Sequence, residues 1–357
     1  MTVMIITRYI CRQILQATLA VALILLVVVV LGRMLNYLSE ASQGALDPDV
    51  LTLVLAYRTP DFLQLILPLA LLLGILLALG RLYADNEMTV LTATGMSQGR
   101  LLGITALAAT VVAVLVALLS LQLAPRGSRK VGELLEIQRN LSEFDLLVPG
   151  LFQTSADTGR TTYVERTVEG ELQQVFIYDA ADDRVIMAES AVPIENEEGE
   201  RFVVFRNGSM SEGLGGSDGF TVTQYPELGF RLAPRNIGIT PDVEEKSMTT
   251  GELLADGTPP RLAEWQWRLS LILLVPLLAL LAVPLSKVSP RQGRFARLMP
   301  AILLYLLYLG LLLMCRDAVA KGTLPPVPGL WWVHVVFAAT GALLCRGNAM
   351  PGRSRRG

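Results

Sequence analysis

The chain has 357 residues, of which 52% are hydrophobic and only 17% are charged. This balance is typical of a membrane protein and argues against a soluble globular domain. The formal net charge is −2, and the three cysteines lie in or next to apolar runs with no C-x-x-C spacing. Neither a disulfide framework, a metal site nor a nucleic-acid partner is indicated.

The N-terminus predicts a helix that lies at the membrane surface and then enters the bilayer. Residues 4–12 set Arg8 and Arg12 on one helical face among apolar side chains, as in an interfacial helix. Residues 13–31 carry no charge. They are long enough to cross a hydrocarbon core of about 30 Å and too long for the core of a signal peptide, so we predict an uncleaved first span.

Two further spans follow. The second is predicted over residues 62–80, with Pro60 as a helix start and Pro68 as a kink. A kink frees a backbone carbonyl group, which then needs a donor from a neighbouring helix or from water. The third span is predicted over residues 101–123.

A short polar stretch, residues 81–100, separates the second and third spans. It predicts a helix of about two turns over residues 84–95, with an acidic N-cap and with Gly95 as the stop. Such a helix is too short to be stable alone. We predict that an apolar pair and a carboxylate on it dock into another protein, the alternative being a solvated connecting loop. The residues predicted to make this contact are Asp85, Glu87, Met88 and Leu91.

The composition changes over residues 124–264, which we predict to be an all-β domain preceded by a polar helix. Segments rich in β-branched and aromatic residues alternate with turn residues, and their number and spacing favour an antiparallel sandwich or jelly roll. The predicted strands are RTTYVERTV, LQQVFIYDA, DRVIMAESAVPI, RFVVFRNGSM and FTVTQYPEL.

The C-terminal part returns to the membrane. Residues 265–347 predict three more spans, over 269–285, 298–315 and 330–345, and residues 348–357 form a basic tail. The predicted fold is therefore an α-helical membrane protein with six spans and an inserted all-β domain between residues 124 and 264. Lysine and arginine in the short loops place both termini in the cytoplasm and the β domain in the periplasm.

Several kinds of chemistry have no signature in this sequence. It contains no Walker loop, no H-E-x-x-H, no G-x-S-x-G and no His/Cys cluster with ligand spacing. The predicted spans also lack the Asp, Glu or Arg that ion-coupled carriers place within the membrane. We therefore expect no enzyme, no cofactor and no ion-coupled carrier, and we expect His334 to be a packing residue.

Two blocks of sequence carry a resemblance to a known family. QLILPLALLLGILLALGRLYADNEMTVLTATGMS and VPLSKVSPRQGRFARLMPAILLYLLYL resemble the LptF/LptG permeases of the lipopolysaccharide exporter. The family pattern E-x-T-V-x-x-A-x-G is met between Glu87 and Gly95, and the PRQGR block at residues 290–294 is closer to the LptF branch than to the LptG branch. The resemblance covers essentially the whole chain.

The resemblance implies a set of partners in the bacterial inner membrane. It implies a heterodimer with an LptG-like permease, two copies of a separate LptB-like ATPase, and an LptC-like protein that receives lipopolysaccharide from a periplasmic β-jellyroll. ATP would then be hydrolysed on the partner. The two alternatives to an LptF-like permease are its LptG-like counterpart and a membrane-anchored periplasmic lipid-binding scaffold.

The resemblance also implies roles for particular residues. Glu87 would contact the ATPase, Arg291 and Arg294 are similar to cytoplasmic basic contacts, and Arg33 resembles a residue near the lipid A phosphates. Each has a simpler alternative: a favourable acid at a helix N-terminus, topology anchors, and an arginine that snorkels to the interface. The candidates to line a lipid-accepting jellyroll, or alternatively to form its ordinary core, are Phe176, Tyr178, Val203 and Phe205.

Overall fold

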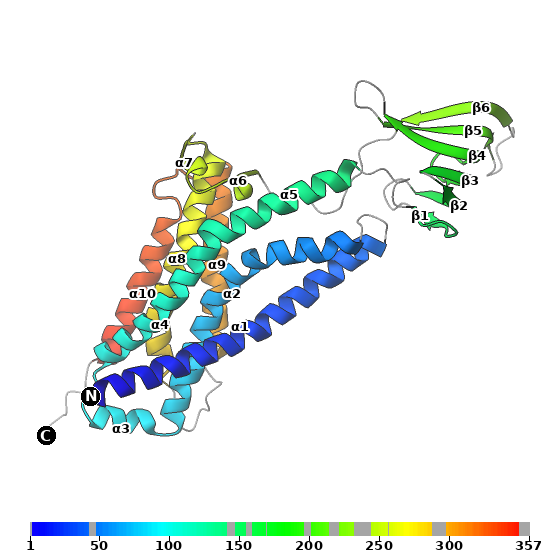
Figure 1. Ribbon diagram of the computed structural model, residues 1–357. Helices are drawn as coiled ribbons and strands as arrows, with labels where there is room; N and C mark the ends of the chain where they lie inside the picture. Colours follow the sequence, from blue (N-terminus) through cyan, green and yellow to red (C-terminus); the bar gives the residue numbers. More distant parts are fainter. Residues whose placement is uncertain are drawn as a thin grey trace, which may run out of the picture. The chain divides into compact units, whose positions relative to one another are not determined.

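The computed structural model describes residues 2–42, 48–140, 147–154, 159–168, 170–195, 201–213, 221–231, 244–255, 257–287 and 298–349. The chain divides into two compact units. The helical unit comprises Met1–Leu31, Tyr57–Lys130 and Asp242–Gly357, and the strand unit comprises Gly32–Ala56 and Val131–Pro241. Figure 1 shows the helices and strands in sequence colours.

Among the described residues, five helical stretches are long and apolar enough to cross a membrane. They contain the first five predicted spans and are formed by α1 (Thr2–Ser42), α2 (Pro48–Ala84), α4 (Gln98–Leu118), α8 (Pro259–Leu285) and α9 (Leu298–Ala320). The sixth predicted span coincides with α10 (Trp331–Ala349). That α10 crosses the membrane remains a prediction.

The helix boundaries differ from the predicted ones in two places. The predicted interfacial helix and the first span form one continuous helix, α1. Pro60 lies inside α2 and does not start it. Membrane helices tolerate proline where neighbouring groups or water satisfy the freed carbonyl group. Near the second proline, Pro68, the hydroxyl of Tyr305 on α9 donates to the Leu65 carbonyl oxygen at 2.8 Å. A neighbouring helix therefore donates to a backbone carbonyl group in the turn before Pro68.

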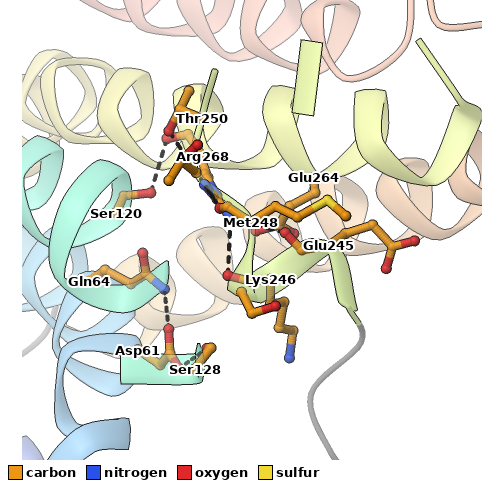
Figure 2. Close-up of polar contacts among 12 residues, drawn as sticks. Asp61, Gln64, Ser120, Ser128, Glu245, Lys246, Met248, Thr250, Glu264 and Arg268 are labelled. Atoms are coloured by element: carbon orange, nitrogen blue, oxygen red, sulfur yellow. Dashed lines mark hydrogen bonds and ion pairs between the residues drawn. The ribbon is translucent and has the colours of Figure 1, made fainter. Parts of the chain in front are cut away.

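The third span continues beyond its predicted end. After α4, a π-helical turn, η1 (Leu119–Leu123), leads directly into α5 (Ala124–Asn140), the predicted polar helix. Gly127 allows α5 to approach α2 closely, since a Cβ atom there would lie 2.2 Å from the Tyr57 carbonyl oxygen. Next to it, the Ser128 hydroxyl donates to Asp61 Oδ2 at 3.4 Å (Figure 2).

α8 lies at the centre of the helical unit and contacts α4, α9 and α10. Its apolar residues face several directions, which is the pattern of a helix buried on most sides. Leu271, Leu274, Leu278 and Leu281 have no exposed surface. A buried polar bridge joins the three C-terminal helices: His334 on α10 lies 2.6 Å from the Tyr308 hydroxyl on α9 and 2.9 Å from the Ser270 hydroxyl on α8. His334 is thus a packing residue with two hydrogen-bond partners, as expected.

The strand unit contains one six-stranded antiparallel sheet in the order β1 to β6. The strands are β1 (Gln153–Thr154), β2 (Arg160–Val168), β3 (Glu171–Asp179), β4 (Arg184–Glu195), β5 (Arg201–Glu212) and β6 (Thr221–Arg231). The five predicted strands are confirmed. A jelly roll has two sheets with Greek-key connections, whereas the described strands form a single meander, so only the antiparallel all-β prediction holds.

Local irregularities decide which side chains the sheet buries. Gln174 in β3 and Asn207 in β5 have positive φ angles of 54° and 51°. Each interrupts the alternation of faces without a change in the pairing register. Leu172 and Val175 are consequently both buried although they are three residues apart.

Candidate functional site

The predicted docking helix exists, and it is shorter than predicted. α3 (Glu87–Ala93) has seven residues, and its N-cap is Asn86 with a φ angle of 60° and no side-chain capping bond. The prediction that Asp85 is the N-cap is wrong. α2 continues to Ala84, so Asp85 lies in the turn, one residue too early, and its carboxylate pairs with Arg81 Nε at 3.4 Å.

The end of α3 is a Schellman motif. Gly95 has a φ angle of 92°, its N–H donates to the Thr92 carbonyl oxygen at 3.0 Å, and the Met96 N–H donates to the Leu91 carbonyl oxygen at 3.0 Å. Glycine tolerates this left-handed backbone at no steric cost, and the two bonds satisfy carbonyl groups that a helix end leaves open. Gly95 is therefore confirmed as the stop.

The apolar pair on α3 faces the chain's own helices. Met88 is 2% exposed and Leu91 is half-buried, and both belong to the core of the helical unit together with Met96. The prediction of an outward-facing Met88 is wrong for this chain, because the apolar side of a short helix is covered here by the spans beside it. The large apolar side chain that faces outward is Val90, which is 63% exposed.

Glu87 begins α3 and is bound to the N-terminal helix. The hydroxyl of Tyr9 on α1 donates to Glu87 Oε2 at 3.1 Å. The Glu87 side chain is half-buried, so part of the carboxylate stays available at the surface. Sequence reasoning missed Tyr9, because residues 78 positions apart give no local pattern.

The remaining predicted contact residues are distributed over the chain. Arg291 and Arg294 lie outside the described residues. Arg33 is exposed on α1, in the part of that helix that belongs to the strand unit. Nothing in the structure tests the predicted roles of these three arginines.

The four predicted lipid-lining residues do not share one surface. Val203 and Phe205 are 0% and 1% exposed and belong to the core of the sheet, which was the alternative interpretation. Phe176 and Tyr178 are half-buried and alternate along β3 with buried neighbours, so they occupy the other face. On that face Phe176 contacts Phe152, with ring centroids 6.1 Å apart.

Phe176 also lines a hollow of about 940 Å³ on the sheet. Its lining mixes the side chains of Tyr163 and Met187 with the carboxylates Glu165 and Glu189. Tyr225 borders the same hollow and donates to the Met187 carbonyl oxygen at 3.1 Å. Burial raises the pKa of Tyr225 to about 12, so its hydroxyl remains a neutral donor at physiological pH.

A second cluster of polar side chains lies where α8 begins. Arg268 is 2% exposed and Glu264 is 6% exposed, and Arg268 Nε donates to Glu264 Oε1 at 3.1 Å. Figure 2 shows the guanidinium group of Arg268 surrounded by the backbone that precedes α8. This part of the chain includes α6 (Glu244–Ser247) and α7 (Glu252–Ala255).

All five N–H donors of Arg268 have an acceptor. Besides the bond to Glu264, Nη1 donates to the Met248 carbonyl oxygen at 3.0 Å and to Thr250 Oγ1 at 3.3 Å. Nη2 donates to the carbonyl oxygens of Glu245 and Lys246, both at 3.1 Å. One side chain thus fixes four residues in α6 and in the turn that leads to α7. Lysine, with three donors on a single nitrogen, cannot reproduce this fork.

The cluster extends to α9. Glu264 Oε2 accepts from Arg316 Nη2 at 2.7 Å, and the Arg316 guanidinium lies 5.1 Å from the centre of the Trp267 ring. Glu264 and Arg268 lie before the predicted span, residues 269–285, but inside α8, which begins ten residues earlier at Pro259. The signal in the sequence was the i, i+4 spacing of Glu264 and Arg268.

The chain is similar to a known family of membrane proteins along nearly its whole length. The family model for the lipopolysaccharide export system permease LptF/LptG matches residues 8–346. The chain belongs to the LptF/LptG permease family. It is 30% identical to the lipopolysaccharide export system permease protein LptF of Escherichia coli K12, over 99% of this chain and 98% of that protein. The proteins of the same name from Escherichia coli O157:H7 and Shigella flexneri match to the same extent.

In this LptF/LptG permease, the two sequence blocks that resemble the family lie on α2 and α3 and on α8 and α9. The first block runs from α2 through α3 to the turn before α4, and the second begins at the end of α8 and continues into α9. The chain is therefore a lipopolysaccharide export permease, a helical membrane protein with an antiparallel β domain.

Proposed function

We propose that this chain is the LptF-type subunit of the exporter and that α3 couples it to a separate LptB-like ATPase. Two ATPase copies would bind at the α3 end, an LptG-like permease would complete the membrane cavity, and an LptC-like protein would receive lipid from the strand unit. The names of the curated relatives support the LptF branch. In this arrangement α3 and both termini lie in the cytoplasm and the sheet lies in the periplasm of a bacterium with two membranes.

The coupling proposal rests on one observation: one side of α3 is buried among the spans and the other side is exposed. Met88 and Leu91 anchor α3 in the same apolar core as α2 and α4, so a displacement of α3 is passed to two spans. Its outward side presents Val90 beside the half-buried Glu87. Docking between protein surfaces commonly combines an apolar contact with a charge of defined position. Asp85 is exposed next to Glu87 and adds negative charge.

The mechanism follows from the chemistry of the cargo. Each methylene group of an acyl chain that leaves an apolar environment costs about 0.8 kcal/mol. A lipid with several chains therefore enters a membrane cavity readily and leaves it only when work is done. Closure of the ATPase pair would move α3, narrow the cavity and displace the lipid towards the sheet. Arg33 would meet the phosphates of the lipid, Phe176 and Tyr178 would accept acyl chains, and Arg291 and Arg294 would add cytoplasmic contacts.

Two variants separate docking from the internal role of Glu87. Glu87→Ala removes both the carboxylate and the bond from Tyr9, whereas Tyr9→Phe removes only the bond. We expect Glu87→Ala to weaken co-purification of the ATPase and lipid-stimulated ATP turnover, and Tyr9→Phe to leave both near their original values. Equal losses in the two variants would show that Glu87 merely holds α1 against α3.

A charge on the outward side of α3 tests the same surface without touching Glu87. Val90→Asp places a carboxylate where Val90 is 63% exposed, so the chain itself does not bury it. We expect an assembled permease pair that binds less ATPase. Unchanged binding and turnover would place the docking surface elsewhere.

A further inference from the structure

A hollow of about 670 Å³ lies beside the N-terminal half of α1 in the helical unit. Residues 4–19 of α1 and Leu107 on α4 line it. Its α1 lining residues fall into two rows spaced four residues apart, and such rows on a helix form ridges with a groove between them. Arg8 and Arg12 belong to one row, and Cys11, Leu15 and Leu19 belong to the other.

The two ends of this hollow differ in chemistry. Arg8 and Arg12 are both exposed and lie one helical turn apart, so both guanidinium groups can reach one ligand. Beyond them the lining is mainly apolar along Leu15 and Leu19, with Gln16 as its one polar side chain, for roughly 10 Å at 1.5 Å per residue. The described lining residues include no Asp or Glu, so the hollow itself supplies no counter-charge.

Arg8 and Arg12 could serve only to orient the first span in the membrane. That role would explain their positive charge and would not explain the hollow beside them. Positive residues near a membrane surface set the orientation of a span by charge alone and need no apolar groove next to them. A groove that joins two guanidinium groups to an apolar wall matches an amphiphile with an anionic headgroup. Basic pockets beside membrane helices on the cytoplasmic side bind such headgroups, and the guanidinium group matches phosphate geometry.

We propose that this hollow binds one anionic phospholipid from the leaflet at the α3 end. Its phosphate lies between Arg8 and Arg12, and one acyl chain lies along Leu15, Leu19 and Leu107. Tyr9, which follows Arg8 directly, holds Glu87 at the start of α3. The lipid therefore binds the same helical turn of α1 that contacts α3.

The test uses the full permease complex with its partner subunits, reconstituted in nanodiscs of phosphatidylcholine with a minor fraction of phosphatidylglycerol. Retained lipid is counted by native mass spectrometry. We expect the wild-type complex to retain phosphatidylglycerol in preference to phosphatidylcholine, and the Arg8→Gln/Arg12→Gln variant to lose this preference at least fivefold. The matched control is Arg346→Gln, which removes an exposed arginine from the last turn of α10, outside the hollow, and should retain the lipid.

A second variant tests the apolar half without changing charge. Leu107 is 53% exposed, so Leu107→Trp can fill the hollow without disturbing the core. We expect it to lower phosphatidylglycerol retention as well. Cys11 gives an independent readout, because bound lipid should slow its reaction with a membrane-permeant maleimide while Cys345, outside the hollow, serves as the internal reference.

Three outcomes would overturn the proposal. The first is a wild-type complex with no preference for phosphatidylglycerol. The second is an equal loss in Arg346→Gln, which would mean that surface charge alone attracts the lipid. The third is protection of Cys11 that is the same with and without phosphatidylglycerol, which would mean that a protein subunit covers the hollow. ATPase co-purification is measured on the same samples, so a failure of the coupling proposal is seen separately.

Discussion

The two ends of the helical unit are held by different kinds of interaction. α4 has 21 residues, about 30 Å of helix, and begins beside the α3 turn. Just beyond its far end, Ser120 donates to the Arg268 carbonyl oxygen. At the α3 end, apolar contacts of Met88 and Met96 hold the chain, together with single side-chain bonds from Tyr9 and from Gln98. At the other end, a buried guanidinium group makes five hydrogen bonds, three to backbone carbonyl oxygens and two to the side chains of Thr250 and Glu264.

This difference matters for a subunit that must pass on motion. Apolar contacts have little directionality, so α3 can tilt about the buried Met88 and press on α2 and α4 without breaking a directional bond. A buried ion pair with many hydrogen bonds is rigid, because breaking any part leaves a buried polar group without its partner. We infer that α3 is the movable end and that the α6–α7 segment is the fixed end.

Removing the guanidinium group should have the largest effect. Arg268→Met leaves the acceptors at Glu245, Met248 and Thr250, all partly buried, without their donor. Glu264 keeps its bond from Arg316, so the loss comes from these three acceptors, at about 3 kcal/mol of unfolding free energy or roughly 1 kcal/mol per hydrogen bond. The measurement is reversible unfolding in mixed detergent micelles, followed by the fluorescence of the chain's tryptophans.

Arg129→Met is the matched control. Arg129 also contacts this segment, donating to the Ser247 carbonyl oxygen at 3.2 Å, and its side chain is 52% exposed. An exposed pair contributes about 0–1 kcal/mol, so this variant should unfold almost like the wild type. Equal losses in the two variants would mean that burial at Arg268 adds no rigidity.

A backbone change at the α3 end, Gly95→Ala, should lower the unfolding free energy by a smaller amount. Gly95→Ala forces an L-residue into a φ angle of 92°, which costs about 1–2 kcal/mol. Gly99, in the first turn of α4, is the control: a Cβ atom added at either glycine would meet no neighbouring atom within 4 Å, and alanine is the better helix former. We expect Gly99→Ala to gain about 0.5–1 kcal/mol in the same unfolding assay. The same sign in both variants would contradict the Schellman ending of α3.

Hydropathy and periodicity were sufficient for the elements of the fold. They located the apolar stretches and the five longer strands because each signal lies within some 10 to 20 consecutive residues. They did not show that Pro60 would lie inside a helix, since a neighbouring helix decides whether a proline is tolerated. The buried face of the sheet was also hidden, because the positive φ angles at Gln174 and Asn207 shift the alternation of side chains.

The candidate site was predictable in position and not in orientation. The sequence indicates that α3 has an apolar side, and it does not indicate whether a partner or the chain itself covers that side. Met88 proved to be covered by the chain. Arg268 was similarly ambiguous, because an arginine that precedes an apolar run is usually an interfacial residue. Its burial depends on α6 and α7, about 20 residues away along the chain.

The smallest predicted effect is a pH dependence at α7, which lies beside the segment that Arg268 holds. Thr249 and Glu252 form a capping box: the Thr249 N–H donates to Glu252 Oε2 at 2.7 Å, and the Glu252 N–H donates to Thr249 Oγ1 at 3.4 Å. The bond from the Thr249 N–H holds the pKa of Glu252 below its usual value. A lowered folded-state pKa gives stability that is present above the unfolded-state pKa, about 4.3, and is lost as the pH falls through the folded-state pKa.

Acidification should therefore loosen α7 and leave the backbone bound by Arg268 in place. We expect the Leu253 amide, which donates to the Thr249 carbonyl oxygen, to lose hydrogen-exchange protection as the pH falls through the lowered folded-state pKa of Glu252, after correction for intrinsic rates. Glu252→Gln should abolish that pH dependence. Residues 245–248 should stay protected over the same range, because the guanidinium group that holds them remains charged. Simultaneous loss of protection at Leu253 and at residues 245–248 would show that the backbone held by Arg268 and the capping box form one cooperative element.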